Sequence, residues 1–409
     1  MTSVLLLSNG HGEDLSGSLL GRELQERGVI VEALPLVGHG EPYRRAGIPV
    51  LGTTREFSTG GIGYTSLAGR VTEALEGQAL YLLARLRVLA CSRRGTRRLV
   101  VVVGDVVPVL AAWLARLPSA VYLVAYSSHY EGRLRLPWPC GWLLRRPGVA
   151  AVWSRDALTA ADLSRQLGRP VRFLGNPFLD PVAPPAAPLP AAAGPSLALL
   201  PGSRMPEARR NLERLLRVLA LLPSGLRQPG TLTLRAALVR DLQATTVARL
   251  AEPLGWRTGP AEDGAGAGGR LLRGHGLAVE LHWDRFAAVL AGADLVLSMT
   301  GTAAEQAVGL GKPVLQVVGD GPQFTAGFAE AQRRLLGPGV VCAPGTAGLA
   351  ETLRETARMA AELLARASDR PAAAAWRRQL AQEGEQRLGA PGGTSRMADA
   401  IMRLLSRSS

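Results

Sequence analysis

The sequence predicts an α/β protein with parallel, doubly wound sheets. Short aliphatic runs alternate with amphipathic stretches along 409 residues, and apolar residues make up 47% of the chain. A chain of this length usually exceeds what one hydrophobic core spans, so we expect two domains. Residues 181–195 are rich in proline and alanine, which is the composition of a semi-rigid linker between them.

The N-terminal domain, residues 1–180, alternates predicted strands with predicted helices. The strands are Ser3–Ser8, Val29–Val37, Leu99–Val103, Ala120–Ala125, Val149–Trp153 and Val171–Leu174. The helices are Leu15–Arg27, Ser66–Ala90, Val106–Arg116 and Arg155–Leu167, and a glycine-rich stretch runs to Gly63. Such alternation predicts a parallel sheet with helices on both faces.

The C-terminal domain, residues 196–370, repeats this alternation. It opens on the strand Ser196–Leu200, and a second buried strand, Ala293–Met299, leads into the helix Ala303–Leu310. The Ala/Gly-rich insertion Ala261–Gly269 is expected to form a mobile loop. Residues 371–409 are predicted to be helical.

The first candidate site follows the strand Ser196–Leu200, where the chain reads Pro-Gly-Ser-Arg-Met-Pro-Glu and ends at Glu207. The N–H groups at a helix N-terminus lack intrahelical partners, and glycine lets a phosphate approach the main chain. Gly202 and Ser203 are therefore predicted to meet a phosphate group, to which the Arg204 guanidinium adds charge-assisted donors. Pro206 fits the first turn of the following helix. The alternative is an ordinary strand-to-helix turn that carries an arginine.

A second candidate turn, Thr300-Gly301-Thr302, precedes the helix Ala303–Leu310 and repeats this pattern. Glu305, one turn into the helix, could accept hydrogen bonds from vicinal sugar hydroxyls. The alternative is a favourable negative charge in the first helical turn. Two such turns in one half of the chain favour an anion site.

These two motifs resemble a known family. The pattern Leu-Pro-Gly-Ser-Arg-x-x-Glu followed by Thr-Gly-Thr-Ala-Ala-Glu is similar to lipid-A-disaccharide synthase and, more broadly, to the GT-B glycosyltransferases that use UDP-sugars. The segment Gly301–Gln332, with its Gly-Lys-Pro turn at Lys312 and its Pro-Gln pair at Gln323, also resembles the donor half of the muramyl-lipid N-acetylglucosaminyltransferases.

The resemblance implies a GT-B architecture, in which two Rossmann-like domains face a central cleft. The UDP-sugar would be a substrate, with no cofactor. Gly202, Ser203 and Arg204 would face the diphosphate, Glu305 the ribose and Gln323 the donor sugar. The final helix, expected over Gly393–Leu405, would cross back to the N-terminal domain. The synthase's early Ser-Gly-acid signature is replaced here by Asn9–Asp14.

Three candidate catalytic bases lie beyond the carboxyl ends of the predicted strands, where ligands gather in open α/β sheets. They are His11, Glu13 and Asp105. Inverting sugar transfer needs a group that takes the acceptor hydroxyl proton, which an imidazole or a carboxylate of raised pKa can do. The resemblance relates His11 to a loop histidine of the muramyl-lipid enzymes and Asp105 to a strand-ending aspartate of the synthase. Asp14 is expected to be a helix N-cap.

The net charge of +14 indicates anionic partners. Two segments, Leu80–Arg98 and Arg133–Arg146, combine aliphatic residues with arginine, as elements at a membrane surface do. The alternative is an element packed in the core with solvated arginines on its outer face, and for Leu80–Ala90 this alternative is favoured. The second segment is predicted to be an exposed loop because Pro137 and Pro139 forbid a regular helix. It carries the candidate acceptor and membrane residues Arg133, Arg135, Trp138, Trp142, Arg145 and Arg146.

Other classes of protein fit the sequence less well. There is no nucleic-acid-binding module, the three cysteines are widely separated and the histidines occur singly, so we expect neither a disulfide framework nor a metal site. The chain starts directly with a strand, and its apolar runs are shorter than a membrane span, so we expect a cytoplasmic protein, peripherally associated with the inner face of the membrane.

The function predicted from the sequence is transfer of a sugar from a UDP-sugar to a lipid or lipid-phosphate acceptor, inverting and independent of metal. The alternatives are a UDP-sugar 2-epimerase and a non-catalytic relative that binds a nucleotide-sugar or a lipid.

Overall fold

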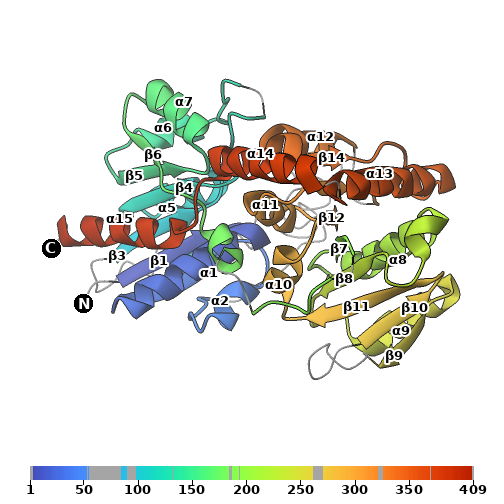
Figure 1. Ribbon diagram of the computed structural model, residues 1–409. Helices are drawn as coiled ribbons and strands as arrows, with labels where there is room; N and C mark the ends of the chain where they lie inside the picture. The colour runs from blue at the N-terminus through green and yellow to red at the C-terminus, as the bar shows by residue number, and fades with distance from the viewer. Residues whose placement is uncertain are drawn as a thin grey trace. The chain divides into compact units, whose positions relative to one another are not determined.

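The computed structural model describes residues 3–52, 54, 84–89, 98–130, 132–183, 187–192, 194–260, 270–320, 326–368 and 370–407. They form two compact units (Figure 1). Unit 1 comprises Met1–Asp180 and Gly389–Ser409, and unit 2 comprises Pro181–Leu388. Several sequence predictions fall outside the described residues: the Gly-rich stretch near Gly63, the insertion Ala261–Gly269, Gln323, and most of Ser66–Ala90 and Leu80–Arg98.

Unit 1 is built on a six-stranded sheet in the order β2-β1-β3-β4-β5-β6, with every described neighbouring pair parallel. The strands are β1 (Ser3–Ser8), β2 (Ile30–Pro35), β3 (Arg98–Val103), β4 (Ser119–Leu123), β5 (Val149–Ser154) and β6 (Val171–Phe173). The helices are α1 (His11–Glu26), α2 (Glu41–Arg45), α5 (Val106–Leu114), α6 (Cys140–Leu144), α7 (Ala157–Leu167) and α15 (Gly393–Arg407).

Helices cover both faces of this sheet because the strands carry buried aliphatic side chains on both sides. Leu5 and Leu7 of β1 belong to a core shared with α5, α6 and α7. Leu6 points to the other face, where a Cβ added at Gly21 of α1 would meet its Cδ1 at 2.7 Å. The last helix, α15, packs against α1, as Figure 1 shows. The sheet of unit 1 is thus doubly wound.

Unit 2 contains an eight-stranded sheet in the order β14-β13-β12-β7-β8-β11-β10-β9. Its strands are β7 (Ser196–Leu200), β8 (Thr233–Leu238), β9 (Arg257–Pro260), β10 (Arg270–Gly274), β11 (Leu277–Trp283), β12 (Leu295–Ser298), β13 (Val314–Gln316) and β14 (Val340–Cys342). Its helices are α8 (Glu207–Ala220), α9 (Ala244–Ala251), α10 (Phe286–Ala291), α11 (Thr302–Gly309), α12 (Ala326–Leu336), α13 (Ala350–Ser368) and α14 (Arg370–Leu388). The six strands from β14 to β11 are parallel, and β10 and β9 extend the sheet as an antiparallel edge that the sequence did not predict.

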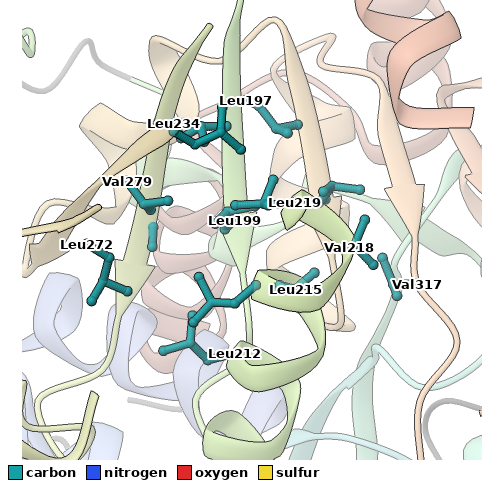
Figure 2. Packing of buried hydrophobic residues seen from close by; sticks show 14 of the residues in the cluster. Leu197, Leu199, Leu212, Leu215, Val218, Leu219, Leu234, Leu272, Val279 and Val317 are labelled. Atoms are coloured by element: carbon teal, nitrogen blue, oxygen red, sulfur yellow. The ribbon is translucent and has the colours of Figure 1, made fainter. Parts of the chain in front are cut away.

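The core of unit 2 fixes where its first loop begins. Leu197 and Leu199 of β7 contact the apolar face of α8, which carries Leu212, Leu215 and Leu219 at helical spacing (Figure 2). All five side chains are fully buried. Burying a leucine side chain contributes about 1.5–3 kcal/mol, so the strand–loop–helix unit β7–α8 is firmly anchored at both ends.

A search of the described helices found none with the length and apolar content that a membrane span requires.

Candidate functional site

Each unit has a point where the strand order reverses direction. In unit 2 the chain proceeds from β7 outward through β8 on one side and later through β12 on the other. Ligands of open α/β sheets bind beyond the carboxyl ends of the strands at such a point. Leu200 ends β7 and is in register with Ser298, which ends β12. The two motifs found in the sequence therefore emerge side by side.

The loops after β7 and β12 contact each other. Gly202 has a φ of 107°, and a Cβ there would lie 3.5 Å from Met299 O and 3.8 Å from Thr300 Cγ2. Positive φ of this size favours glycine, since a side chain would be strained. Gly202 thus brings its backbone close to the second loop. Ser203 is exposed, while Thr300, Gly301 and Thr302 are partly accessible.

Buried polar side chains that the sequence analysis missed hold these loops. Asn211 of α8 donates from Nδ2 to Pro201 O at 2.8 Å. Ser298 Oγ lies 2.7 Å from Thr300 Oγ1 and accepts from Thr300 N, and Gln316 Nε2 donates to Thr300 O at 3.3 Å. Asn211 could have been found as the one amide on the apolar face of α8. Gln316 gives no such signal.

Four helices begin at these switch points, and three of them, α1, α8 and α11, have Gly10, Pro206 and Gly301 as their N-cap residues. None of these residue types offers a side-chain acceptor to the first N–H groups. By contrast, Asp105 and Asp156 cap α5 and α7 with their carboxylates. Uncapped helix N-termini carry a partial positive charge and outward N–H groups, which suits a phosphate. The sequence analysis placed Pro206 in the first helical turn, but Pro206 is the N-cap residue, one position before that turn.

The charged residues of the first motif differ in their partners. Glu207 forms an ion pair with Arg210 at 3.1 Å on the surface of α8. No carboxylate among the described residues forms an ion pair with Arg204, which is half-buried. Its guanidinium charge is therefore available to an anion beside Gly202. Glu305 lies one turn into α11 and is also half-buried.

The loop after β13 is tied to α8 immediately before Gln323, which itself lies outside the described residues. Arg214 donates to Val318 O at 3.0 Å and to an Asp320 carboxylate oxygen at 2.7 Å. The Arg214 side chain is mostly buried, so this contact fixes the start of the loop.

In unit 1 the order reverses between β1 and β3, where Ser8 is in register with Val103. The loops after these strands contact each other, because a Cβ on Gly104 would lie 2.2 Å from Asn9 Oδ1. His11, Glu13 and Asp105 therefore emerge at one edge of the sheet.

The segment His11–Asp14 is the first turn of α1, not the loop that the sequence predicts. The N-cap is Gly10, so the expectation that Asp14 is the N-cap is wrong. Asp14 is buried and accepts a hydrogen bond from Ser8 Oγ at 2.6 Å, and Ser8 Oγ lies 2.9 Å from the Tyr43 hydroxyl. The Glu13 carboxylate folds back over Gly10, and His11 is exposed.

Asp105 is buried, and its carboxylate bonds to the backbone of its own unit. Its Oδ1 accepts from Val107 N at 2.8 Å and so caps α5. Burial raises the pKa of Asp105 above its ordinary value, against the opposing effect of the hydrogen bonds from Val107 and Asn9. Of the three candidate bases, His11 has the most accessible side chain.

The segment Arg133–Arg146 is only partly the exposed loop that the sequence predicts. Cys140, Leu143 and Leu144 are buried in α6, and Leu134 is buried as well. Prolines precede this short helix, so they do not interrupt it. The exposed part carries Trp138, whose side chain is 91% accessible.

Two further tryptophans extend this exposed part. Trp142 forms an edge-to-face pair with Trp113 of α5 at 5.4 Å, and the Arg146 guanidinium lies 3.7 Å from the Trp142 ring centroid. Trp113, Trp138 and Trp142 are the exposed tryptophans of the described residues, and we call them the tryptophan patch. Trp113 was missed because it is remote in sequence. No group of three His, Cys, Asp or Glu side chains gathers in the described residues as a metal site would.

Over 192 residues the chain is 32% identical to lipid-A-disaccharide synthase of Alkalilimnicola ehrlichii, a match that covers 43% of this chain and 44% of the synthase. The chain thus matches less than half the length of that curated relative. No protein-family model matches the chain.

Solved structures extend the likeness to both units. The calicheamicin glycosyltransferase CalG4 superposes with a TM-score of 0.61 at 18% identity, covering 99% of this chain and 98% of that one. This chain has the GT-B fold. MurG of Acinetobacter baumannii has a TM-score of 0.55 at 15% identity over 98% of this chain and all of that one. S. aureus MnaA in complex with UDP has a TM-score of 0.56 at 13% identity, covering 99% and 97%. The two Rossmann-like units of the GT-B fold are units 1 and 2.

Proposed function

We propose that this protein is a glycosyltransferase that takes a sugar from a UDP-sugar bound at the switch point of unit 2. The observation that carries the proposal is the meeting of two loops there, each leading into a helix without a side-chain cap, beside an Arg204 guanidinium that no described carboxylate neutralises. The sequence match to lipid-A-disaccharide synthase and the UDP held by MnaA support the choice of donor.

In this proposal the chain's groups act on the departing diphosphate. Negative charge grows on it as the sugar leaves, and preorganised donors stabilise that charge without reorganising. Arg204 and the N-terminal N–H groups of α8 and α11 supply these donors, while Glu305 accepts hydrogen bonds from the ribose. His11 takes the proton of the acceptor hydroxyl, since an imidazole has a pKa suited to this at neutral pH.

We further propose that the acceptor is a lipid or lipid-phosphate reached at the cytoplasmic face of the membrane. The tryptophan patch supports this, because indole rings favour the depth of lipid headgroups and the surrounding arginines attract acidic lipids. MurG and lipid-A-disaccharide synthase, which the chain resembles in fold and in part of its sequence, add to this support.

A transfer assay with labelled UDP-sugars and extracted membrane lipids tests the donor proposal. Arg204→Ala should lower the transfer rate because it removes about 2–4 kcal/mol of transition-state stabilisation. The control variant Arg209→Ala, which changes an exposed arginine on α8, should keep the rate of the parent. Equal activity of both variants and the parent would contradict the role of Arg204. Conversion of a UDP-sugar to its 2-epimer without any acceptor would identify a 2-epimerase instead.

Sedimentation with vesicles tests the membrane proposal. Changing Trp138 and Trp142 to serine should lower binding to acidic vesicles and activity on lipid-embedded acceptor, while UDP binding stays unchanged. Binding should also weaken as salt rises, because salt screens the arginine charges. If the parent and the double variant pellet equally, the tryptophan patch does not bind membranes.

A further inference from the structure

An open pocket of about 600 Å³ lies on the flank of unit 1 that α6 and α7 form. It is lined by Arg133, Leu134, Arg135, Leu136, Gly141, Arg145, Gln166 and Leu167. We call it the arginine pocket. α6 packs against α5 and β5, and α7 packs against β5 and β6. None of the candidate catalytic groups His11, Glu13 and Asp105 is among the residues that line the arginine pocket.

The loop that carries two of these arginines is fixed in place. Leu134 is buried, its N–H donates to Asp162 Oδ2 at 2.7 Å, and its carbonyl accepts from Gln166 Nε2 at 2.9 Å. With Leu134 held on both sides by α7, Arg133 and Arg135 stand exposed on either side of it. Arg145 donates to the Gln166 carbonyl, which brings a third guanidinium to the same rim.

The charge of the arginine pocket is unbalanced. Between Asp105 and Asp156 the sequence contains six arginines and a single acidic residue, Glu131. Among the described residues no carboxylate forms an ion pair with Arg133, Arg135 or Arg145; the nearby Asp162 is paired with Arg165 at 3.9 Å. Three guanidiniums that extend from an anchored backbone and have no carboxylate partners favour a phosphate group, whose oxygens accept two donors at once.

The surroundings of the arginine pocket indicate an amphiphilic ligand. Leu134, Leu136 and Leu167 line it beside the guanidiniums, and the exposed Trp138 follows Leu136 by two residues. A single-stranded nucleic acid would need successive open aromatic faces on which bases stack. Arg146 already covers a face of Trp142, so the surface offers little of that kind.

We propose that the arginine pocket binds the phosphate of an anionic phospholipid while Trp138 enters the lipid interface. This inference deepens the membrane part of the proposed function and rests on it. In this proposal the arginine pocket binds lipid that is not consumed, and it orients unit 1 on the membrane.

The test compares two triple variants that lose the same charge. Arg133→Gln, Arg135→Gln and Arg145→Gln empty the pocket of its guanidiniums, and Arg249→Gln, Arg354→Gln and Arg378→Gln remove three exposed arginines of unit 2. Binding is measured by flotation with phosphatidylcholine vesicles that contain phosphatidylglycerol or lack it. Each arginine near an anionic membrane strengthens binding about fivefold, so the pocket variant should bind acidic vesicles roughly 100-fold more weakly than the control variant.

Three results would overturn the inference. Equal losses in the two triple variants would assign binding to net charge alone. Inorganic phosphate that binds the parent but not the pocket variant without vesicles, and displaces the parent from vesicles far better than chloride of equal ionic strength, would identify a site for free phosphate. Tighter binding of a single-stranded oligonucleotide than of acidic vesicles would indicate a nucleic-acid surface. UDP titration of the pocket variant distinguishes failure of this inference from failure of the proposed donor site. An unchanged UDP affinity together with lost vesicle binding would show that the donor site of unit 2 is intact in the variant.

Discussion

Asp14 and Asp105 lie near the switch point of unit 1 and have different contacts. Asp14, in the first turn of α1, is buried and accepts a hydrogen bond from Ser8, close to Tyr43. Asp105 caps α5 through Val107 N. Asp14 thus supports the first turn of α1, where His11 stands exposed, and Asp105 supports the start of α5. At the scale of the residue, the buried carboxylates of Asp14 and Asp105 hold the starts of these helices, and the exposed His11 is the group that can meet a substrate.

The first prediction compares the two candidate bases in one transfer assay. His11→Ala should lower turnover by about 100- to 10,000-fold with little change in donor affinity, which is the usual contribution of a general base. Asp105→Asn keeps an N-cap acceptor and should retain most activity. A fully active His11→Ala variant, or an inactive but folded Asp105→Asn variant, would reverse this assignment.

The second prediction concerns the pH dependence of stability. Burial raises the pKa of Asp105, so the folded protein holds this proton more tightly than the unfolded chain does. The free energy of unfolding contributed by Asp105 therefore falls as the pH rises from the unfolded pKa, about 4, through the raised folded pKa. Asp105→Asn lacks this loss, so its stability relative to the parent should increase with pH over that range. Urea unfolding at several pH values measures it, and identical pH profiles would contradict the prediction.

At the scale of the element, the helices that begin at the switch points differ in their N-caps. α5 and α7 begin with aspartate caps, whereas α1, α8 and α11 begin after glycine or proline. Aspartate satisfies the first N–H groups within the protein, and glycine leaves them to a ligand or to water. The start of α1 was predicted four residues late, at Leu15 instead of His11, because Gly10 and Gly12 are typical of a loop.

The third prediction measures what an aspartate cap contributes. Asp156 is fully buried and accepts from Thr159 N at 2.6 Å and from Ser127 Oγ at 2.7 Å. Asp156→Ala leaves both donors without an acceptor and should lower the free energy of unfolding by about 2–4 kcal/mol. Asp156→Asn, which keeps one oxygen, should lose less. Equal urea midpoints for the alanine variant and the parent would show that α7 does not depend on this cap.

The sequence predicted the strands and helices better than the tertiary contacts that hold them. Aliphatic runs placed β1 and β7 at the residues observed, because a buried strand needs apolar side chains whatever its neighbours. The antiparallel strands β9 and β10 and the contact of Asn211 with Pro201 were not predicted, since each depends on a partner that is set by the tertiary fold. Likewise, Arg133–Arg146 was predicted as a loop because its prolines can be recognised locally in the sequence. The burial of Leu143 and Leu144 cannot be recognised in this way, because it depends on the tertiary fold.

At the scale of the whole molecule, unit 1 is closed by a helix from the other end of the chain. Met397, Ala398 and Ile401 of α15 are fully buried, and Arg27, the C-cap residue of α1, donates to Ser395 and Asp399. Asp180 accepts from Gly392 N at 2.6 Å and from Thr394 N at 2.8 Å, where α15 begins. A single carboxylate at the end of the N-terminal segment therefore secures the C-terminal helix.

The fourth prediction tests this connection. Asp180→Ala should destabilise unit 1 by about 2 kcal/mol, because two N–H groups lose their acceptor at the start of α15. Amide hydrogen exchange should accelerate in α15, α1 and the strands β1 and β3 and stay unchanged in β7 and β12. Acceleration in both units, or in neither, would show that Asp180 does not act through α15.

The central claim is that the switch point of unit 2 binds a nucleoside diphosphate, and isothermal titration calorimetry of the parent protein with UDP and with uridine tests it most directly. UDP should bind far more tightly than uridine, and Arg204→Ala should remove most of that difference, because the diphosphate is the part that Arg204 and the N-termini of α8 and α11 hold. A parent protein that binds no nucleotide or nucleotide-sugar, or that binds UDP no better than uridine, would contradict the account.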